Sequence, residues 1–422
     1  MKHIKFLIFI IVLLISSANQ AQSSKEEFLK DLKHSGGIYQ IYDYTKTKST
    51  PAPEGYKPFY ISHYGRHGSR WIQTPLSYTA PLAILKEAHE AGKLSALGES
   101  LYGRLIIIAD DAFGRYGDLS PLGVEEHKEI AGRMFTSFPE IFSTENGRKC
   151  FIYSRSTVVP RCIISMAANN ERLKELNPKI EITREAYARN SYLNNSYSNV
   201  KKDSSTLIIN NFLKKHLDVN KIINRIFSDT VYTKSHLTNP ISFVRDLNLI
   251  NSDLLDVKHL NISMADVLSP DELFVLWQAA NLNMYYTCGP SAINGKVAMD
   301  SSKLLLNDII KCADIAIEKG NISADLRFGH DTYIIPLLAL MDVKGMNVIE
   351  NNPEKVYQVW SDFKVSPMGA NLQIVFFRNK KSRDVIVKIL HNEKEIEIPV
   401  KTDIAPFYHW KDVQEYYKKK LN

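Results

Sequence analysis

The feature that most constrains the fold is a local pattern of short apolar strand, turn and helix that occurs three times in the chain. The expected strands cover residues 59–64, 150–155 and 324–328. Strands that alternate with helices in this way form a parallel sheet with helices packed on its faces. The sequence therefore predicts an α/β fold with a mostly parallel sheet.

The segments around these strands carry boundary signals. Residues 45–58 contain three prolines and predict an extended lead-in before the first strand, because proline has no N–H to give to a sheet. Ser120 and Pro121 predict the start of a helix, with serine as the N-cap and proline at the first helical position. Helices are also expected after Pro160 and after Gly329, each following one of the strands.

The length of 422 residues favours two folding units, since single hydrophobic cores stop growing near ~250–300 residues. Strand alternation is absent between residues 170 and 299, where 207–227 and 271–286 have helical patterning. We expect an inserted, mainly helical cap at 170–299 and an α/β catalytic core made of 22–169 and 300–422. The alternative is that the middle segment continues the α/β core with weak patterning.

The first 21 residues have the composition of a secretory signal peptide. Lys2 and Lys5 precede an apolar run at 6–15, and small residues follow up to Ala21. A membrane anchor is the alternative, but the run has about ten residues against the ~20 that span a bilayer. We expect a secreted or periplasmic protein without a membrane span in the mature chain.

Composition narrows the class of partner. Without the leader the chain keeps a net charge of about +5, which suits an anionic substrate, and no basic run with interleaved aromatics indicates a nucleic acid. The four cysteines are too far apart for the paired spacing of a zinc site, so buried thiols or a disulfide are expected. Their positions are Cys150, Cys162, Cys288 and Cys312.

The run Arg66-His67-Gly68-Ser69-Arg70 directly follows the first expected strand. Ligands bind beyond the carboxyl ends of the strands in an open parallel sheet. Arg66 and Arg70 offer planar, permanently charged groups that pair with phosphate oxygens. His67 is the member of this trio that can be neutral and nucleophilic at pH 5–7, which favours a phosphohistidine intermediate. His63, four residues earlier, is interpreted as a packing residue or as a residue that supports the site from behind its ligands.

The other two strand ends add residues of matching chemistry. The second strand leads to Arg161, and the third leads to His330 and Asp331 at the start of a helix, where backbone amides favour anions. All three strand ends should share one edge of the sheet. Asp331 would need a raised pKa to donate a proton, and a bound phosphate anion would supply that effect.

These residues carry a resemblance to a known family. The Arg-His-Gly-x-Arg run, Leu-Ser-Pro-Leu-Gly at 119–123, Arg-Ser-Thr followed by Arg161, and His330-Asp331 resemble the histidine acid phosphatases in that order. The chain is most similar to the multiple inositol polyphosphate phosphatases of that family. Ser-Thr-Val-Val-Pro-Arg-Cys at 156–162 and Ala-Asn-Leu at 370–372 carry this second similarity.

The resemblance implies a phosphoglycerate-mutase-like three-layer core with a helical cap, and no metal or other cofactor. It implies that His67 is the nucleophile and Asp331 the proton donor. The phosphate ligands that it implies are Arg66, Arg70, Arg161 and His330. Arg155 matches a neighbouring arginine of the family, for which we expect support of the site rather than contact with phosphate.

The expected substrate is a small anionic phosphomonoester. The similarity at 156–162 favours inositol polyphosphates such as phytate, whereas His-Asp-Thr at 330–332, where that group usually has His-Ala-Glu, keeps a broad acid phosphatase open. Recognition of further phosphates would need cations turned toward the cleft. The candidates for that role are Arg184, Arg189, Lys201 and Lys202. A mutase and a non-catalytic phosphate-binding protein are the rival functions, and the sequence leaves the oligomeric state open.

Overall fold

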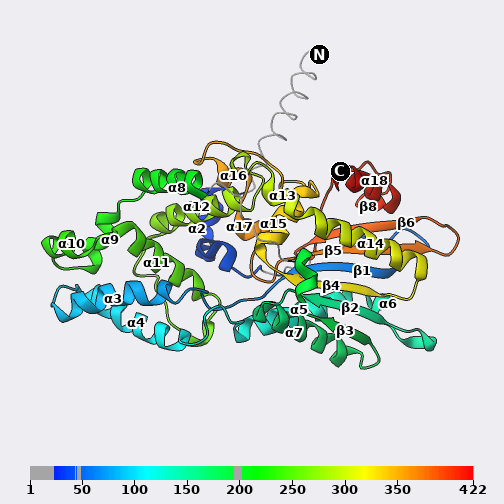
Figure 1. The fold of residues 1–422 in the computed structure, drawn as a ribbon, viewed down its shortest axis with the longest axis horizontal. Coiled ribbons are helices and arrows are strands. Elements are labelled where there is room, and N and C mark those ends of the chain that lie inside the picture. Colours follow the sequence, from blue (N-terminus) through cyan, green and yellow to red (C-terminus); the bar gives the residue numbers. More distant parts are fainter. Residues whose placement is uncertain (1–22, 43, 45–48, 194–201, 422) are drawn as a thin grey trace, which may run out of the picture.

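The computed structural model describes residues 23–42, 44, 49–193 and 202–421, so the leader expected at 1–21 lies outside the described residues. Figure 1 shows a sheet flanked by helices at one end of the molecule and a group of helices at the other. None of the described helices is both long and apolar enough to cross a membrane.

A single sheet forms the core, with the strand order β3-β2-β4-β1-β5-β6-β7 and with β8 paired to β6. β3, β2, β4 and β1 are parallel, and the strands from β5 onward are antiparallel to their neighbours. The bounds are β1 Tyr56–Arg66, β2 Phe151–Ser156, β3 Glu181–Glu185, β4 Ala324–Gly329, β5 Asn371–Asn379, β6 Val385–His391, β7 Lys394–Glu395 and β8 Phe407–His409. The parallel α/β core is confirmed, and the antiparallel half adds strands that the sequence analysis did not identify.

The extended lead-in predicted at 45–58 ends earlier than expected, because β1 already begins at Tyr56. Pro58 lies within the strand, where the pairing of β1 with β5 shifts register between Pro58 and Tyr60. A register shift leaves a backbone position without its ladder partner, so a proline is tolerated there.

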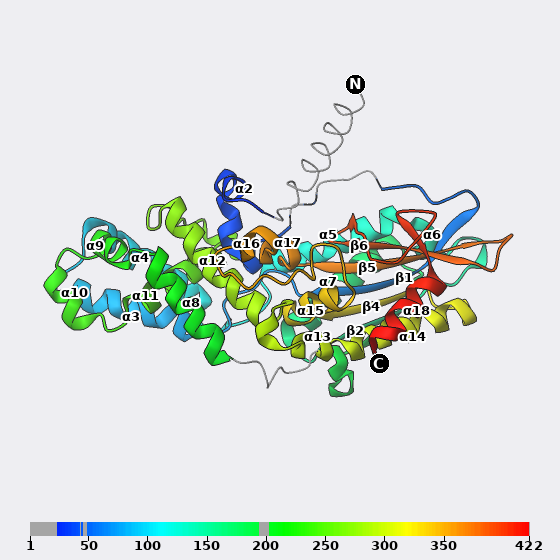
Figure 2. The same cartoon turned by 90° about the horizontal axis from the view of Figure 1, so that it is seen from above.

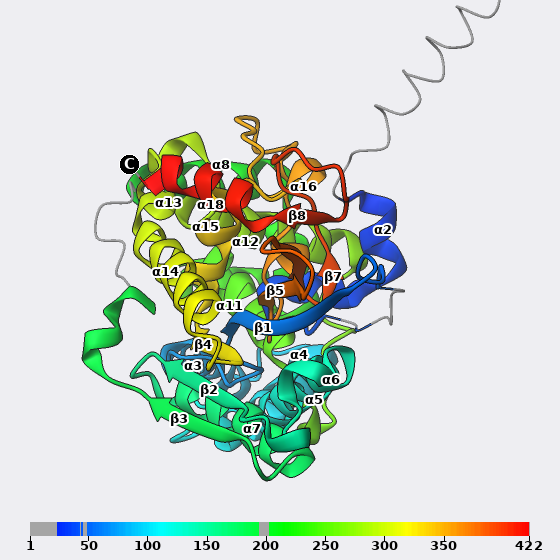
Figure 3. The ribbon, with the colours of Figure 1, turned by 90° about the vertical axis from the view of Figure 1, so that its right-hand side faces the viewer.

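Helices cover both faces of the sheet and produce three layers, as the end-on view in Figure 3 shows. α14 and α15 contact β1 from one face, and α6 and α7 contact β1 and β2 from the other. The bounds of the flanking helices are α5 Pro121–Ser137, α6 Pro139–Phe142, α7 Pro160–Leu176, α13 Val297–Ser301, α14 Lys303–Lys319, α15 Asp331–Leu340 and α18 Trp410–Leu421. The Ser120 hydroxyl accepts a hydrogen bond from Gly123 N at 3.3 Å, which confirms the expected cap of α5.

The helical group at the far end includes α3 and α4 besides the helices that follow residue 202 (Figure 2). Its helices are α3 Leu76–Glu90, α4 Ala96–Ala112, α8 Lys202–His216, α9 Val219–Ile226, α10 Thr230–His236, α11 Pro240–Asp253 and α12 Pro270–Thr287. α3 contacts α11, and α4 contacts α9, although both were expected in the core. β3, which falls in the range expected for the cap, pairs with β2. We therefore propose that the cap includes 76–112 and begins its second part after β3.

The N-terminal segment was not assigned any structure from the sequence. It forms α2 (Lys25–Lys30) and the 3-10 helix η1 (Leu32–Tyr39), which contacts α11, α12 and α17 (Asp362–Val365). Ser23 is buried, and its hydroxyl donates to the Tyr357 carbonyl at 2.6 Å, beside α16 (Val356–Val359). This segment is thus packed against both the cap and the loops that follow α15.

The four cysteines are free thiols. Cys150, Cys162 and Cys288 are buried, and Cys312 is partly buried. Of the two expectations, buried thiols rather than a disulfide describe this structure.

Candidate active site

The predicted site residues meet where β1 and β4 end. Arg66 is the last residue of β1 and pairs in register with Gly329, the last residue of β4. His67 N donates to the Gly329 carbonyl at 2.9 Å, so the residues that follow the two strands are held side by side. The rings of His67 and His330 lie edge to face, with their centroids 5.6 Å apart.

Arg161 reaches the same place from the first turn of α7. Its Nη2 lies 3.5 Å from His330 Nδ1. The other side of the His330 ring meets Thr157 Oγ1 at 3.4 Å and Cys162 Sγ at 3.6 Å. His330 is therefore held by side chains that follow β2, and Arg161 remains partly exposed.

Arg66 is completely buried and tied to three separate segments. Its Nη1 donates to the Ile38 carbonyl at 2.5 Å and to the Ser366 carbonyl at 2.7 Å. Its Nη2 forms an ion pair with Asp331 Oδ2 at 2.9 Å. Arg66 thus links the expected proton donor to the N-terminal segment.

The N-terminal segment also holds the second arginine of the motif. Arg70 Nη2 donates to the Tyr39 hydroxyl at 3.4 Å, and the Arg70 guanidinium lies 5.0 Å from the centre of the Tyr39 ring. Arg70 Nη1 donates to the Trp71 carbonyl at 2.9 Å. Neither Ile38 nor Tyr39 was predicted as a site residue.

Residues 66–71, which we call the catalytic loop after the expected role of His67, have every backbone N–H engaged within the protein. The partners are the Ala370 carbonyl at 2.8 Å for Arg66, the Gly329 carbonyl at 2.9 Å for His67, Ser165 Oγ at 3.2 Å for Gly68, Glu126 Oε2 at 2.7 Å for Ser69, Asp256 Oδ2 at 3.3 Å for Arg70 and the Asp118 carbonyl at 3.1 Å for Trp71. A phosphate-binding nest needs free N–H groups. Within residues 66–71, only side chains are therefore free to bind a phosphate.

Gly68 explains how the loop packs so closely on α5. A Cβ atom at this position would lie 2.5 Å from the Gly123 carbonyl oxygen, which is backbone and cannot swing away. The motif therefore requires glycine between His67 and Ser69 for a steric reason.

The electrostatics favour a neutral His67. Burial lowers its pKa well below the usual value, and Arg66, Arg161, Arg70 and His330 lower the pKa further. Its Nδ1 lies 2.8 Å from the Gly68 carbonyl oxygen, which can only accept a proton. Nδ1 therefore carries the hydrogen, and Nε2 keeps a lone pair for attack on phosphorus.

Burial and the neighbouring arginines also shift the pKa values of Asp331 and His330. Burial raises the pKa of Asp331, but Arg66, His330 and Arg70 together outweigh it, so the pKa is below the usual value and the carboxyl is ionised before substrate arrives. Burial and Arg161 lower the pKa of His330 to about 4. A phosphate anion beside Asp331 would raise its pKa toward the protonated state that a proton donor needs.

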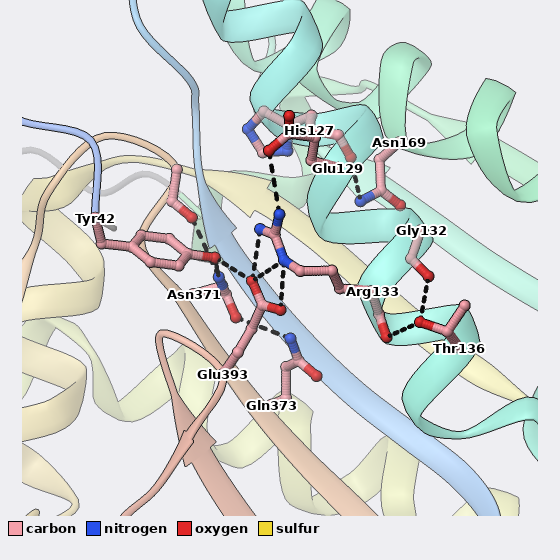
Figure 4. Close-up of polar contacts among 11 residues, drawn as sticks. Tyr42, His127, Glu129, Gly132, Arg133, Thr136, Asn169, Asn371, Gln373 and Glu393 are labelled. Carbon is pink, nitrogen blue, oxygen red and sulfur yellow. Dashed lines mark hydrogen bonds and ion pairs between the residues drawn. The ribbon is translucent and has the colours of Figure 1, made fainter. Parts of the chain in front are cut away.

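Figure 4 shows the contacts of Asn371, part of the Ala-Asn-Leu segment. Asn371 Nδ2 donates to the Tyr42 hydroxyl at 2.8 Å, and that hydroxyl donates to Glu393 Oε1 at 2.5 Å. Glu393 in turn accepts from Arg133 Nε at 2.8 Å. Because the neighbouring Ala370 carbonyl accepts the Arg66 N–H, this network fixes the backbone beside the site without entering it.

Two predicted supporting residues lie within the sheet layer. Arg155 forms an ion pair with Asp325 and lies 3.6 Å from Asp308 Oδ1, so its guanidinium is engaged away from the phosphate ligands. His63 is buried against Phe328, with ring centroids 5.5 Å apart, as expected of a packing residue.

Two of the four expected outer cations, Arg184 and Arg189, are engaged elsewhere in the part of the chain that the structure describes. Arg184 Nη1 donates to the Ile182 carbonyl at 3.0 Å, and Arg189 pairs with Glu185 at 3.4 Å. Neither contacts a proposed phosphate ligand. Lys201 and the side chain of Lys202 lie outside the described residues.

Comparison with known proteins agrees with this geometry. No protein-family model matches the chain. The chain is 24% identical to human multiple inositol polyphosphate phosphatase 1 over 335 residues. This aligned region is 72% of this chain and 66% of the length of that relative. Among solved structures, it resembles the Bifidobacterium longum multiple inositol polyphosphate phosphatase in complex with inositol hexasulfate, with a TM-score of 0.75, 16% identity, and coverage of 91% of this chain and 97% of that one.

A phytase from D. castellii has the same fold, with a TM-score of 0.69, 16% identity, and coverage of 94% of this chain and 87% of that one. At these identities the structural matches establish the fold. The motifs, the sequence relative and the shared fold together confirm the resemblance of the chain to the histidine acid phosphatase family, and to its inositol polyphosphate phosphatases and phytases in particular.

Proposed function

We propose that the protein is an exported acid phosphomonoesterase that works through a phosphohistidine at His67. The observation that carries this proposal is the meeting of a buried neutral imidazole, three arginines and a histidine–aspartate pair at one edge of a parallel sheet. Such a site can bind a phosphoryl group and supply both a nucleophile and a proton.

In the first step, His67 Nε2 forms a bond to phosphorus as the bond from phosphorus to the ester oxygen breaks. Asp331 gives its proton to the departing oxygen, so the alcohol leaves neutral. Arg66, Arg70 and Arg161 balance the charge on the phosphoryl oxygens, and His330 donates a hydrogen bond to them.

In the second step, water attacks phosphorus and the bond from His67 to phosphorus breaks. Asp331, now ionised, accepts a proton from that water, and inorganic phosphate is released. The ion pair from Arg66 to Asp331 at 2.9 Å keeps the carboxyl beside the reacting group in both steps.

We further propose inositol polyphosphates, including phytate, as substrates. The sequence relative supports this substrate class, and so does the fold shared with a protein solved with inositol hexasulfate.

The structure offers an outer cation other than those first considered. Trp71 directly follows Arg70, its Nε1 donates to Asp111 Oδ2 at 2.9 Å, and the Arg115 guanidinium lies 5.2 Å from its ring. Arg115, which also pairs with Asp111 Oδ1 at 2.9 Å, is thus a candidate for contact with a second phosphate.

Export is part of the proposal and rests on the composition of residues 1–21. Amino-terminal sequencing of the protein purified from outside the cytoplasm should begin near Gln22. A mature protein that still begins at Met1 would contradict export by this route.

The nucleophile is tested with a substrate that carries a labelled phosphoryl group, in a reaction stopped rapidly without acid, because phosphohistidine is labile to acid. Wild-type protein should retain the labelled phosphoryl group on His67. His67→Ala should retain none and lose nearly all turnover while still binding inorganic phosphate. Replacing the exposed His236 by alanine is the matched control and should keep both label and turnover. A His67→Ala protein with a tenth of the wild-type rate would refute the assignment.

The substrate class is tested separately, by comparing kcat/KM for phytate with that for an aryl phosphate at pH 4–6. Background hydrolysis of phytate beside clear hydrolysis of the aryl phosphate would favour a broad acid phosphatase. Product that retains the transferred phosphate would favour a mutase, and inactivity on every ester would favour a phosphate-binding protein.

A further inference from the structure

Two carboxyl groups hold consecutive N–H groups of the catalytic loop. Glu126 accepts from Ser69 N at 2.7 Å through Oε2 and from the Ser69 hydroxyl at 2.8 Å through Oε1. Asp256 Oδ2 accepts from Arg70 N at 3.3 Å. The loop between the nucleophile and the second phosphate-binding arginine is therefore fixed by acid side chains.

A third carboxyl holds the next part of the chain. Asp253 Oδ2 accepts from the Tyr78 hydroxyl at 2.7 Å, and that hydroxyl accepts from Ile72 N at 2.9 Å. We call Glu126, Asp253 and Asp256 the acid cluster.

The acid cluster joins the two parts of the molecule. Glu126 belongs to α5, which packs on the sheet layer, whereas Asp253 ends α11 and Asp256 follows it in the helical group. Asp256 N donates to the Asp253 carbonyl at 2.8 Å, so both aspartates sit on one turn. The catalytic loop is thus hydrogen-bonded both to the core and to the cap.

The charges around the acid cluster do not balance if all its members ionise. The cations facing it are Arg66, Arg70 and Lys258, and the other titratable groups facing it are Tyr39 and Tyr78. Asp331 interacts with the same two arginines. Arg66 is already paired with Asp331. Three further carboxylates would compete with a phosphate anion for the same two buried guanidiniums.

Burial also disfavours the ionised forms. Asp253 and Asp256 are each 1% exposed, and their Oδ1 atoms have no hydrogen-bond partner among the described residues. A buried carboxylate oxygen without a partner is costly, whereas a neutral acid still accepts an N–H through its carbonyl oxygen. Burial raises the pKa of Glu126 and of Asp253 to about 7 each, and burial followed by Asp253 and Glu126 raises that of Asp256.

We propose that Glu126 and Asp256 are positioning residues that keep the catalytic loop ready for phosphate only while the acid cluster is neutral, so that ionisation of the cluster sets the upper pH limit of activity. This inference rests on the proposed phosphatase function. In the neutral state the acids hold the Ser69 and Arg70 amides without adding charge. In the ionised state they draw Arg66 and Arg70 toward themselves and repel the incoming phosphate.

The experiment compares kcat/KM for an aryl phosphate in wild type, Glu126→Gln and Asp256→Asn between pH 5 and pH 8. An aryl leaving group hardly needs a proton, so ionisation of Asp331 has little influence, and the titration of the substrate cancels in the ratio of variant to wild type. Each amide copies the shape of the neutral acid. Glu126, with a pKa of about 7, is about nine-tenths ionised at pH 8, so the ratio for Glu126→Gln should rise about ten-fold from pH 5 to pH 8. The ratio for Asp256→Asn should rise in the same direction, because burial and the neighbouring acids raise the pKa of Asp256.

The matched control is Glu272→Gln. Glu272 is also largely buried and accepts a backbone N–H, that of Ser269 at 2.8 Å, but it pairs with Arg225 in the cap and has no contact with the catalytic loop. The ratio of kcat/KM for Glu272→Gln to that for wild type should be the same at every pH. A flat ratio for both Glu126→Gln and Asp256→Asn, in proteins that are active at pH 5, overturns the inference and leaves the phosphatase function intact. An inactive wild type at pH 5 instead refutes the function.

A second measurement, infrared spectroscopy, uses the wild-type protein alone and so does not depend on the folding of a variant. The infrared carbonyl band of protonated carboxyl groups should persist in wild-type protein at pH 6.5, where free aspartate and glutamate are ionised. It should weaken as the pH rises through 7, where Glu126 and Asp253 ionise. Absence of this band at pH 6.5 would also overturn the inference.

Discussion

Replacing His127 by phenylalanine should make the folded protein more resistant to acid. His127 lies on α5 and is fully buried, with its ring centroid 5.6 Å from that of Phe328. Neither ring nitrogen has a hydrogen-bond partner among the residues that the structure describes. Burial lowers the pKa of His127 to about 4. The backbone carbonyl of His127 accepts from Asn169 Nδ2 at 3.4 Å (Figure 4), a contact that the substitution leaves in place.

The size of the effect follows from proton linkage. As the pH falls below 6.5, the unfolded chain binds a proton at His127 that the folded protein binds only near pH 4. The stability supplied by this residue is therefore complete above pH 6.5 and is lost as the pH falls toward 4. One pKa unit corresponds to about 1.4 kcal/mol, so the loss between pH 7.5 and pH 4.5 is about 2.5 kcal/mol. Phenylalanine binds no proton and escapes this loss.

The assay is the free energy of unfolding in urea at pH 7.5, 6.5, 5.5 and 4.5 for wild type and His127→Phe. Phenylalanine is larger than histidine, but the cost of packing it is the same at each pH and cancels from the trend. The difference in unfolding free energy should move by about 2.5 kcal/mol in favour of the variant from pH 7.5 to pH 4.5. The exposed His236→Phe is the control and should show no trend. A constant difference for His127→Phe would refute the reasoning.

Further predictions concern the site. Asp331→Asn should lower kcat/KM at least ten-fold more for alkyl phosphates than for aryl phosphates, because the better leaving group needs less help from a proton, and equal losses in kcat/KM would refute the general acid. Tyr39→Phe should raise KM several-fold with little change in kcat, since it removes the hydroxyl that Arg70 reaches at 3.4 Å, and an unchanged KM would remove Tyr39 from the site. Arg115→Gln should lower kcat/KM for phytate but not for an aryl phosphate, and equal effects on both would contradict a contact with a second phosphate. EDTA should leave the rate unchanged, because the arginines supply the positive charge, and a loss restored by zinc or magnesium would contradict this.

The parts of the fold that the sequence predicted are those in which local signals coincide with the global structure. Ser120 and Pro121 cap α5 as expected, and the strands that end at Arg66 and Gly329 are where periodicity placed them. The antiparallel strand Asn371–Asn379 was missed because it is buried along most of its length and shows no alternation of polar and apolar residues. Pro58 was assigned to a lead-in because the sequence does not reveal a register shift.

The site was predictable only where its chemistry lies in side chains that follow strands. His67, His330 and Arg161 were predicted in that way, and the structure brings them together. Ile38 acts through its carbonyl oxygen, which every residue has, so nothing in the sequence marks it. Glu126 and Asp256 are brought to the catalytic loop by tertiary packing across 57 and 186 residues of chain, and no local pattern reports contacts over that distance.

The saturated N–H groups of the catalytic loop have a consequence for how the protein folds. Their partners come from the sheet layer through Gly329 and Ala370, from α5 and α7 through Glu126 and Ser165, and from the cap through Asp256. No one of these parts can order the loop alone, so the active conformation arises only after the distant parts of the chain have docked. Unfolding of the cap should remove the catalytic loop from its bound geometry before the sheet itself melts. Loss of activity on heating should therefore follow the least stable of the docked parts.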